Sequence, residues 1–386
     1  MSSVIGWAIQ KQDQPFQLLD YFFGWFSTSE YFLCQVKVQK WQTSGKPTFG
    51  ILHNPDYTYQ ILKNTVSKAI EVRLERFRQK SRIQAGSLIT TVFGDAILPR
   101  GGRVSLSSMI HLLQPLGVNE RLVRTAVYRL VKEEWLQSEA LGRKTDYILT
   151  SSGHRRFAEA SRQIYAADIP GWDRRWRLIL IVGEVNIRSR ESLRKALFWH
   201  GFGETTTGSF VHPTADLEEV MESLVSEGFD GLLGQLMPLV AVNARVAQCA
   251  TDINMVQKAW NLEGLALSYE GFLQKYEPIR DALVANAQED MPEESAFLIR
   301  TLLIHDVRRL LLRDPQLPES LLPAAWPGSR ARHLCRDLYR KLLLVSERHL
   351  DANVRLSNGT VPQASQVVAS RFAYGMDLVE GGLSSV

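Results

Sequence analysis

Cysteine and paired metal-ligating residues are scarce in this sequence. No cysteine belongs to a C-x-x-C pair or a Cys/His spacing that would bind a metal; the three are Cys34, Cys249 and Cys335. The histidines of the predicted C-terminal helices lack the i, i+4 pairing of an H-E-x-x-H zinc motif. We therefore expect no metal site, and we interpret the cysteines as structural thiols.

Long apolar runs are also absent. No stretch of 18 uncharged apolar residues occurs, and the start MSSVIGWAIQKQDQ lacks a basic segment followed by a long hydrophobic one. The sequence thus predicts neither a membrane span nor a secretory signal, and we expect a cytoplasmic location. A composition with 45% hydrophobic and 22% charged residues is typical of a soluble globular protein. The length of 386 residues suggests two or three domains.

Positive charge is concentrated in one segment. From Lys68 to Phe157 there are 16 Lys and Arg against 8 Asp and Glu, a net charge of +8. Because the whole chain carries +4, the remainder carries −4. A basic segment in a mildly acidic chain is a candidate binding surface for a polyanion, and a solvated basic surface is the alternative.

Two helices are predicted at the start of this basic segment. The pattern SKAIEVRLERFRQKSRIQ, from about Ser67, predicts a basic helix with apolar residues at Ile70, Leu74 and Phe77. The stretch GSLITTVFGDAIL (86–98) predicts a second helix, which the following PRGG ends in a turn.

A helix pair follows. The stretch VSLSSMIHLLQPLG predicts a helix that starts at Ser105 or Ser107 and ends at the breakers Pro115 and Gly117. Asn119 is the predicted cap of the next helix, GVNERLVRTAVYRLVKEEWL, whose apolar edge consists of Val123, Ala126, Val127 and Leu130. Two helices joined by a short turn of this kind form a helix-turn-helix.

The opposite edge of the second helix is polar and basic. We expect it to present Arg121, Arg124, Thr125, Tyr128 and Arg129. After it, WLQSEAL and TDYILT predict a hairpin whose GRK turn carries Arg143 and Lys144, which makes the motif a winged helix-turn-helix. Such residues can reach base edges and phosphates in the major groove, and the wing can lie along the backbone or in the minor groove. The alternative is a winged helix that binds another protein.

The middle of the chain alternates predicted strands and helices. PGWDRRWRLILIVGEV (170–185) predicts a strand, and a helix, a strand at GSFVHPT, a second helix and a strand near GLLGQLM follow it. This order is typical of a ferredoxin-like sandwich. GFGETTTG follows a helix and has the wrong glycine spacing for a dinucleotide site, so we interpret it as a loop.

The region 254–353 predicts long helices, and the proline-rich DPQLPESLLPAAWPG (314–328) separates the last two. Several arginines gather around that break: Arg308, Arg309, Arg313, Arg330, Arg332, Arg336 and Arg340. Arginine binds phosphate through a bidentate fork, so they could hold an anionic ligand, although pairing with nearby carboxylates is the more common arrangement.

Several motifs together resemble the PaaX family, the bacterial repressors of phenylacetic acid catabolism. They are SLITTVFGDAILPRGG (87–102), GVNERLVRTAVYRLVKEEWL (117–136), LGRKTDYILTSSG (141–153), WDRRWRLIL (172–180) and LLIHDVRRLLLRDPQLPESLLPAAWPG (302–328). The resemblance implies a repressor, usually a homodimer, that binds double-stranded operator DNA of phenylacetate-degradation genes and is released by phenylacetyl-coenzyme A. It implies no catalytic residue and no cofactor. The alternatives are an acyl-coenzyme A-binding enzyme and a scaffold protein.

These observations predict an α+β fold with an N-terminal winged helix-turn-helix, a central ferredoxin-like α/β sandwich and a C-terminal helical domain. The expected boundaries are 66–165, 170–253 and 254–353, with a tail over 354–386. Residues 1–65 match nothing in the family, so they are either an appended segment or the result of a misassigned start near Val66. For the effector, phosphates require arginines and an acyl group requires an apolar pocket; the candidate residues are Arg308, Arg309, Trp326, Arg332 and Arg336.

Overall fold

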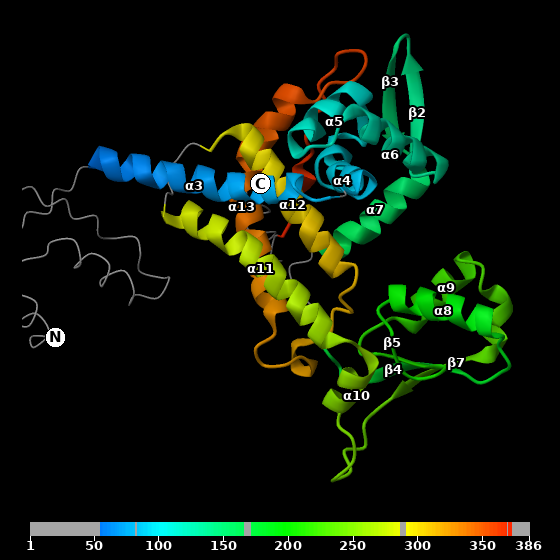
Figure 1. The fold of residues 1–386 in the computed structure, drawn as a ribbon. Helices are drawn as coiled ribbons and strands as arrows, with labels where there is room; N and C mark the ends of the chain where they lie inside the picture. The colour runs from blue at the N-terminus through cyan, green and yellow to red at the C-terminus, as the bar shows by residue number, and fades with distance from the viewer. Residues whose placement is uncertain (1–54, 82, 166–170, 286–290, 369, 373–386) are drawn as a thin grey trace, which may run out of the picture. The chain divides into compact units, whose positions relative to one another are not determined.

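The computed structural model describes residues 55–81, 83–165, 171–285, 291–368 and 370–372 (Figure 1). The predictions for Cys34, for most of residues 1–65 and for the end of the tail lie outside this range. The described part combines helices with a three-stranded and a four-stranded sheet. The predicted α+β class is confirmed.

The first described helix is longer than the sequence pattern predicted. Helix α3 (Pro55–Arg78) begins before Ser67, the expected start. Its predicted apolar side is buried at Ile70, Leu74 and Phe77.

The predicted second helix changes geometry along its length, so a single helix over 86–98 is wrong in its last part. Helix α4 (Ala85–Val92) passes into a π-helical turn (Phe93–Ile97) and then a 3-10 turn (Leu98–Arg100). Within the π turn Gly94 is in close contact with α7, since a Cβ there would lie 2.9 Å from the Phe157 ring. Wide turns of this kind often occur at functional sites.

The predicted helix pair is present, with a strand in front of it. Strand β1 (Arg103–Ser105) precedes α5 (Leu106–Leu113), a 3-10 turn (Gln114–Leu116) and α6 (Glu120–Lys132). The Ser105 side chain caps α5 by accepting a hydrogen bond from the Ser108 amide. Residues 103 and 104 therefore belong to a strand, which the sequence pattern missed.

The predicted hairpin is the rest of that sheet. Strands β2 (Leu136–Leu141) and β3 (Lys144–Leu149) pair antiparallel, and β1 pairs with the other edge of β3. The order is β1-β3-β2, and α7 (Ser151–Ile164) follows directly.

The central region has a β-α-β-β-α-β order, which contains the three predicted strands and two predicted helices together with one further strand, β5. Its elements are β4 (Trp176–Ile181), α8 (Ile187–Trp199), β5 (Gly203–Thr206), β6 (Ser209–His212), α9 (Leu217–Ser226) and β7 (Leu236–Ala241). The strands have the order β5-β6-β4-β7 and all neighbours are antiparallel. This arrangement is that of a ferredoxin-like sandwich.

Two details of this region differ from the prediction. GFGETTTG is not only a loop, because residues 203–206 form β5 and pair with β6. The last strand starts at Leu236, later than expected, since residues 230–235 form a 3-10 helix. It contains Pro238, which lacks an amide hydrogen and is tolerated because β7 is an edge strand.

The C-terminal region is helical, as expected. It contains α10 (Asp252–Ala259), α11 (Leu262–Ala285), α12 (Glu293–Leu311) and α13 (Pro327–Asn353), and the proline-rich segment separates the last two. In the part of the chain that the structure describes, none of the helices is long and apolar enough to cross a membrane.

One apolar core connects helices far apart in the sequence. It contains buried residues of α3 to α7 together with residues of α11, α12 and α13 and Phe372 of the tail. Residues 66–165 and 254–353, predicted as separate domains, therefore share a core. Cys335 is buried within it, whereas Cys249 is exposed and does not fit the expectation of a buried structural thiol.

Candidate nucleic-acid interface

The local sequence fixes the position of α6. Gly117 ends the preceding turn with a positive φ of 78°, a conformation that favours glycine. The Asn119 side chain then accepts a hydrogen bond from the Leu122 amide at 2.9 Å, as predicted for the cap. The predicted apolar edge is buried against the core, at Val123, Ala126, Val127 and Leu130.

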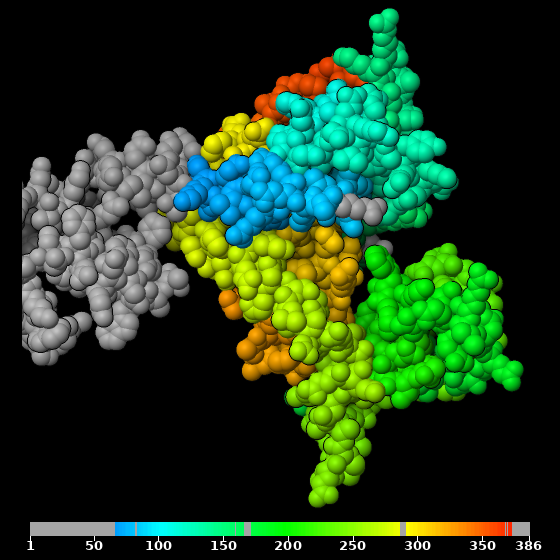
Figure 2. All heavy atoms as spheres, in the orientation of Figure 1, coloured from blue at the N-terminus to red at the C-terminus, as the bar shows by residue number. Residues whose placement is uncertain are grey.

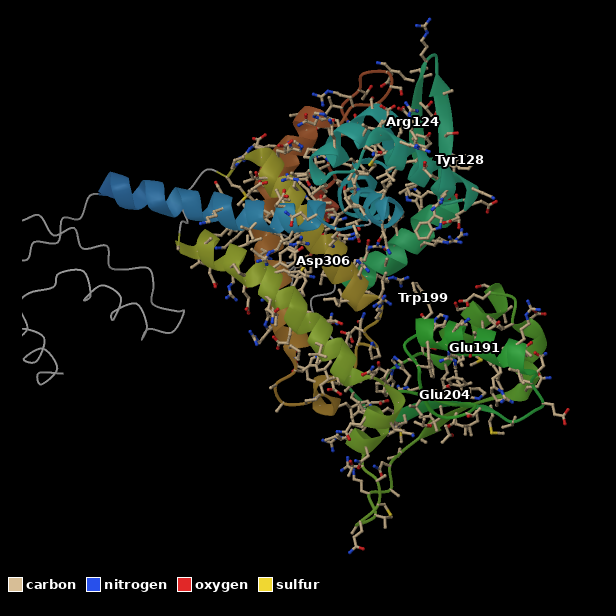
Figure 3. All side chains as sticks on the ribbon, viewed as in Figure 1. Arg124, Tyr128, Glu191, Trp199, Glu204 and Asp306 are labelled. Carbon is tan, nitrogen blue, oxygen red and sulfur yellow. The ribbon has the colours of Figure 1, made fainter. Side chains whose placement is uncertain are left out.

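Because that edge is buried, the other edge of α6 is presented to solvent. All five predicted side chains are exposed: Arg121, Arg124, Thr125, Tyr128 and Arg129. Tyr128, labelled with Arg124 in Figure 3, has 69% of its surface exposed. An aromatic ring this exposed on a basic helix face is available for contact with a partner.

Two of the five side chains have partners on α6 itself. The Arg124 guanidinium lies 2.6 Å from the Glu120 carboxylate, and both side chains are 58% exposed. The Thr125 hydroxyl donates to the Arg121 carbonyl at 2.8 Å. Among the described residues, the side chains of Arg121, Tyr128 and Arg129 make no hydrogen bond or ion pair.

The tip of the hairpin carries two more exposed cations. Arg143 and Lys144 lie at the β2–β3 turn, where Gly142 has a φ of 60°, and both are exposed. Figure 2 shows the hairpin tip standing out from the surrounding surface. The prediction that its tip is basic and exposed is confirmed.

Arg103 joins the three strands at the base of the hairpin. Its guanidinium lies 2.8 Å from Asp146 of β3 and 2.9 Å from Glu139 of β2. The Ser357 amide of the tail donates to the other oxygen of Asp146 at 2.8 Å. Burial raises the pKa of Asp146, but the hydrogen bonds from Ser357 and Arg103 outweigh that effect and lower it. The hairpin is thus tied both to its own sheet and to the tail.

The arginines predicted to bind an effector do not come together on one cavity. Arg308 of α12 donates to the Ser87 hydroxyl at 2.8 Å, and Arg309 is exposed. Arg332 pairs with Asp314 at 3.1 Å, and Arg336 lies 3.4 Å from Asp337. Carboxylate pairing, the alternative raised from the sequence, therefore accounts for the two arginines of α13.

Trp326, the remaining candidate, does line a cavity. This cavity has a volume of about 700 Å³ and lies where the α10–α11 junction meets the segment before α13. Its lining includes Trp260, Lys258 and the prolines Pro323 and Pro327, but none of the four predicted arginines. Sequence analysis missed Trp260 and Lys258 because they lie more than 60 residues from Trp326.

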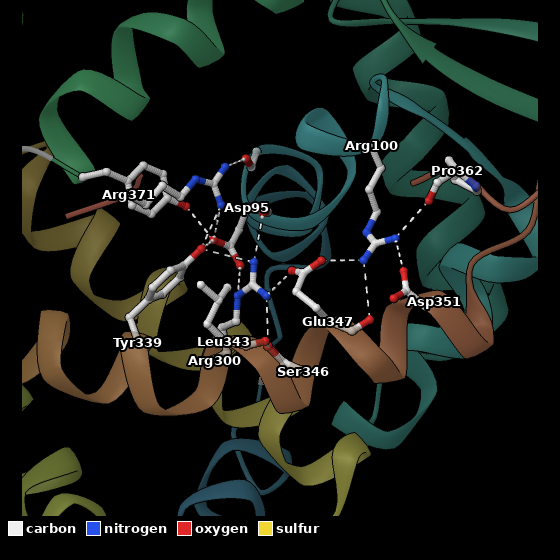
Figure 4. Close-up of polar contacts among 12 residues, drawn as sticks. Asp95, Arg100, Arg300, Tyr339, Leu343, Ser346, Glu347, Asp351, Pro362 and Arg371 are labelled. Atoms are coloured by element: carbon white, nitrogen blue, oxygen red, sulfur yellow. Dashed lines mark hydrogen bonds and ion pairs between the residues drawn. The ribbon is translucent and has the colours of Figure 1, made fainter. Parts of the chain in front are cut away.

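Sequence analysis also missed a buried polar cluster that connects the first helices to the last (Figure 4). Asp95, in the π turn after α4, pairs with Arg300 of α12 at 2.8 Å and with Arg371 of the tail at 2.9 Å. It also accepts hydrogen bonds from the hydroxyls of Tyr165 and Tyr339. Burial raises the pKa of Asp95, but the two arginines outweigh it and hold that pKa below its ordinary value.

The cluster continues through α13 to the 3-10 turn that ends at Arg100. Glu347 pairs with both Arg300 and Arg100, and Arg100 also lies 2.6 Å from Asp351. A separate buried pair joins Arg73 of α3 to Asp306 of α12 at 2.8 Å. The unit that carries α6 is therefore fixed to α12 and α13 by ion pairs as well as by the shared core.

Within the described residues, no cluster of three or more His, Cys, Asp or Glu side chains could hold a metal ion.

Comparison with known proteins identifies the family. Three family profiles match the chain: PaaX-like protein over residues 84–153, the PaaX protein central Cas2-like domain over 170–233 and the PaaX-like protein C-terminal domain over 260–352. The transcriptional repressor PaaX of Escherichia coli (strain K12) is 33% identical over 308 residues, which cover 78% of this chain and 93% of that protein. The chain belongs to the PaaX family. A solved structure, that of the uncharacterized protein Rv0674 from Mycobacterium tuberculosis, is 21% identical and superposes with a TM-score of 0.43. The match covers 65% of this chain and 96% of that one.

Proposed function

We propose that this PaaX-family protein is a transcriptional repressor that binds double-stranded operator DNA of phenylacetate-degradation genes. The observation that carries the proposal is the exposed basic edge of α6, whose opposite edge is buried in the core. The Escherichia coli relative, a transcriptional repressor, supports the same function.

In this proposal residues 85–149 act as a winged helix-turn-helix. Helix α6 enters the major groove, where Arg121 and Arg124 contact base edges and Tyr128 contacts bases or the backbone. The hairpin is the wing, and Arg143 and Lys144 neutralise phosphates or enter the minor groove. The three-stranded sheet and the Arg103 ion pairs hold the wing in a fixed position relative to α6.

The repressor acts as a cytoplasmic homodimer in this proposal. Two copies of α6 then contact successive major grooves, which are separated by about 34 Å on one side of the duplex. An operator with two related half-sites is expected from that symmetry.

Selection of binding sites from a random pool of duplex DNA tests the function and requires no operator sequence in advance. The wild-type protein should enrich a single motif with two half-sites. Replacement of Arg121 and Arg124 together by Ala should abolish enrichment, since each lost base contact costs about 1–3 kcal/mol. The matched control is Arg330→Ala with Arg348→Ala, which removes the same charge from exposed positions on α13. If the wild-type chain enriches nothing, or the α6 variant enriches the same motif as the wild type, DNA recognition by α6 is wrong.

The proposed effector is phenylacetyl-coenzyme A, and its aromatic acyl group occupies the cavity at Trp326. Trp326 and Trp260 supply aromatic surface there, and Lys258 supplies a positive charge for a phosphate. Arg309 is exposed and carries no ion pair among the described residues, so it remains a candidate for the other phosphates.

Release from DNA requires that the effector bind one arrangement of the protein more tightly than the other. A shift of the DNA-competent population from 99:1 to 1:99 requires about 5.5 kcal/mol of differential binding. A ligand that contacts the loop before α13 is well placed to move α13, which is joined to Arg100 and Arg300 through Glu347.

Titration of a protein–DNA complex with phenylacetyl-coenzyme A, free phenylacetate and free coenzyme A tests this part. Only the thioester should release DNA at micromolar concentration, and Trp326→Ala should weaken its effect. Trp199→Ala on α8, labelled in Figure 3, is the control, because Trp199 is 61% exposed and is not among the residues that line the cavity. Free thiol is measured in the same samples, since an enzyme that hydrolyses the thioester would produce it. Equal release by phenylacetate, or a normal response of the Trp326 variant, would contradict the effector site.

A further inference from the structure

Helix α7, directly after the wing, has a basic surface that the DNA-binding motif leaves unused. Its sequence, SSGHRRFAEASRQI, contains three arginines and one glutamate. Arg155, Arg156 and Arg162 are exposed, and the first turn contains no acidic residue. Acidic residues in the first turn would stabilise the helix, so this composition is not explained by helix stability.

The apolar side of α7 holds the start of the helix against the end of α6. Phe157 is buried and packs edge-to-face on Trp135, with ring centroids 5.6 Å apart. Trp135 comes three residues after the last residue of α6, and its amide donates to the Leu130 carbonyl of α6 at 2.9 Å. Figure 1 shows α7 running from the foot of the hairpin beside α6.

The same tryptophan positions one of the arginines. The Arg156 guanidinium lies over the Trp135 ring, 5.0 Å from its centroid, where a cation is attracted by the aromatic face. Stacking leaves the edge of the guanidinium free to donate hydrogen bonds. Arg156 is thus held against a residue that follows the end of α6, and the last turn of α6 carries the exposed Arg129 and Lys132.

Among the described residues, the basic side chains of this junction form no ion pair; they are Arg129, Lys132, Arg155 and Arg156. Two exposed glutamates, Glu133 and Glu134, also lie here and offset part of this positive charge. By contrast, Arg100, Arg300 and Arg332 are all paired with carboxylates. Unpaired arginines on adjacent helix ends form a surface that a row of phosphates would neutralise.

We propose that Arg155 and Arg156 bind backbone phosphates of the DNA that flanks the bases contacted by α6. This inference rests on the proposed DNA-binding function and extends its surface from α6 and the wing to α7. These contacts would carry no sequence information and would set the position of α6 on the duplex. Since each phosphate contact releases counterions, they should appear in the salt dependence of binding.

The experiment measures the dissociation constant of the full-length protein for its selected site and for random DNA over a range of salt concentrations. Arg155→Ala with Arg156→Ala should lower the slope of log K against log salt by about one to two units. Affinity for both DNAs should fall by similar factors. Arg155→Lys with Arg156→Lys retains the charge and should keep most of the slope, and Arg330→Ala with Arg348→Ala should leave it unchanged.

Hydroxyl-radical footprinting supplies a second measurement. The α7 double variant should lose protection at the outer edge of each half-site and keep it at the centre. Should the double variant fail to fold, Arg155→Ala alone removes an exposed side chain and should lower the slope by about one unit. An unchanged slope and footprint with wild-type DNA binding would overturn the α7 proposal alone, whereas absence of DNA binding by the wild type would overturn the proposed function.

Discussion

Asp95 and Arg300 form an ion pair at 2.8 Å between side chains that are almost completely excluded from solvent. The two residues are 205 positions apart, and they connect the π turn after α4 to the middle of α12. Together with Arg371, Tyr165 and Tyr339, they form a polar cluster inside the shared apolar core. The cluster therefore joins α12 and the tail to the segment that precedes the helix pair.

Loss of the Asp95 charge should destabilise the protein strongly. Asp95→Asn leaves the guanidinium groups of Arg300 and Arg371 without this carboxylate in a site that water hardly reaches, and breaking a buried pair in this way costs about 3–5 kcal/mol. Equilibrium urea unfolding at fixed protein concentration measures the effect. The control, Asp281→Asn on the exposed side of α11, should change the unfolding free energy by less than about 0.5 kcal/mol. Equal effects of the two variants would show that the cluster has no special role in stability.

The sequence predicted the interface better than it predicted this cluster. Asn119, Gly117 and the apolar spacing of α6 are local signals, and each acts within one or two turns of the helix that it specifies. When one edge of a helix is buried, the opposite edge faces solvent, so the exposure of Arg121 and Tyr128 followed from the sequence pattern.

Long-range pairing accounts for what the sequence did not reveal. Strand β1 has only three residues, too few to show a period, and Arg103 pairs with Ile148 on a strand more than forty residues later. Asp95 and Arg300 are each a charged residue within a run of apolar residues, which signals a buried partner but does not identify it. The lining of the Trp326 cavity likewise depends on how α10 and α11 return to the segment before α13.

Acid should destabilise the fold through two buried histidines. Burial is the main cause that lowers the pKa of both His212 and His305 to about 4, from an ordinary value of 6.5. Below pH 6.5 the unfolded chain takes up protons that the folded chain does not, so stability falls as the pH falls from 6.5 toward 4. Between pH 7 and pH 5 each histidine should lower the unfolding free energy by about 2 kcal/mol.

Substitution of His212 by Asn tests the assignment. The Nδ1 atom of His212 accepts hydrogen bonds from the Thr214 and Ala215 amides, and an asparagine Oδ1 can accept in nearly the same position. The variant should unfold with a weaker dependence on pH over this range, measured by urea denaturation at pH 7, 6 and 5. His333→Asn, an exposed position, should leave that dependence unchanged. A His212 variant with the wild-type pH dependence would show that His212 does not titrate as described.

The wing should contribute affinity and not sequence preference. Arg143→Ala with Lys144→Ala removes two exposed cations from the hairpin tip, and the backbone pairing of residue 144 with Leu141 does not depend on its side chain. Binding to all DNA sequences should weaken alike, and the salt slope should fall by about one to two units. Fluorescence anisotropy with the selected site and with a scrambled duplex measures both quantities. A loss of preference at constant slope would instead indicate that the wing contacts bases.

Glu120 should increase the preference of α6 for its selected site over random DNA, because its carboxylate weakens binding to random DNA. Its carboxylate lies on the exposed edge of α6 and holds the Arg124 guanidinium at 2.6 Å, so it repels phosphates and restricts the directions in which Arg124 can donate. Glu120→Gln removes the negative charge while keeping the shape of the side chain. Affinity for random DNA should rise by about two- to fivefold, the size expected for an exposed charge interaction of up to about 1 kcal/mol. Affinity for the selected site should rise less, or fall, so that the ratio of specific to random binding decreases.

Glu222→Gln, on the exposed surface of α9, carries the same charge change and should leave the ratio unaltered. A larger ratio for the Glu120 variant than for the wild type would mean that the carboxylate hinders base recognition and does not sharpen it.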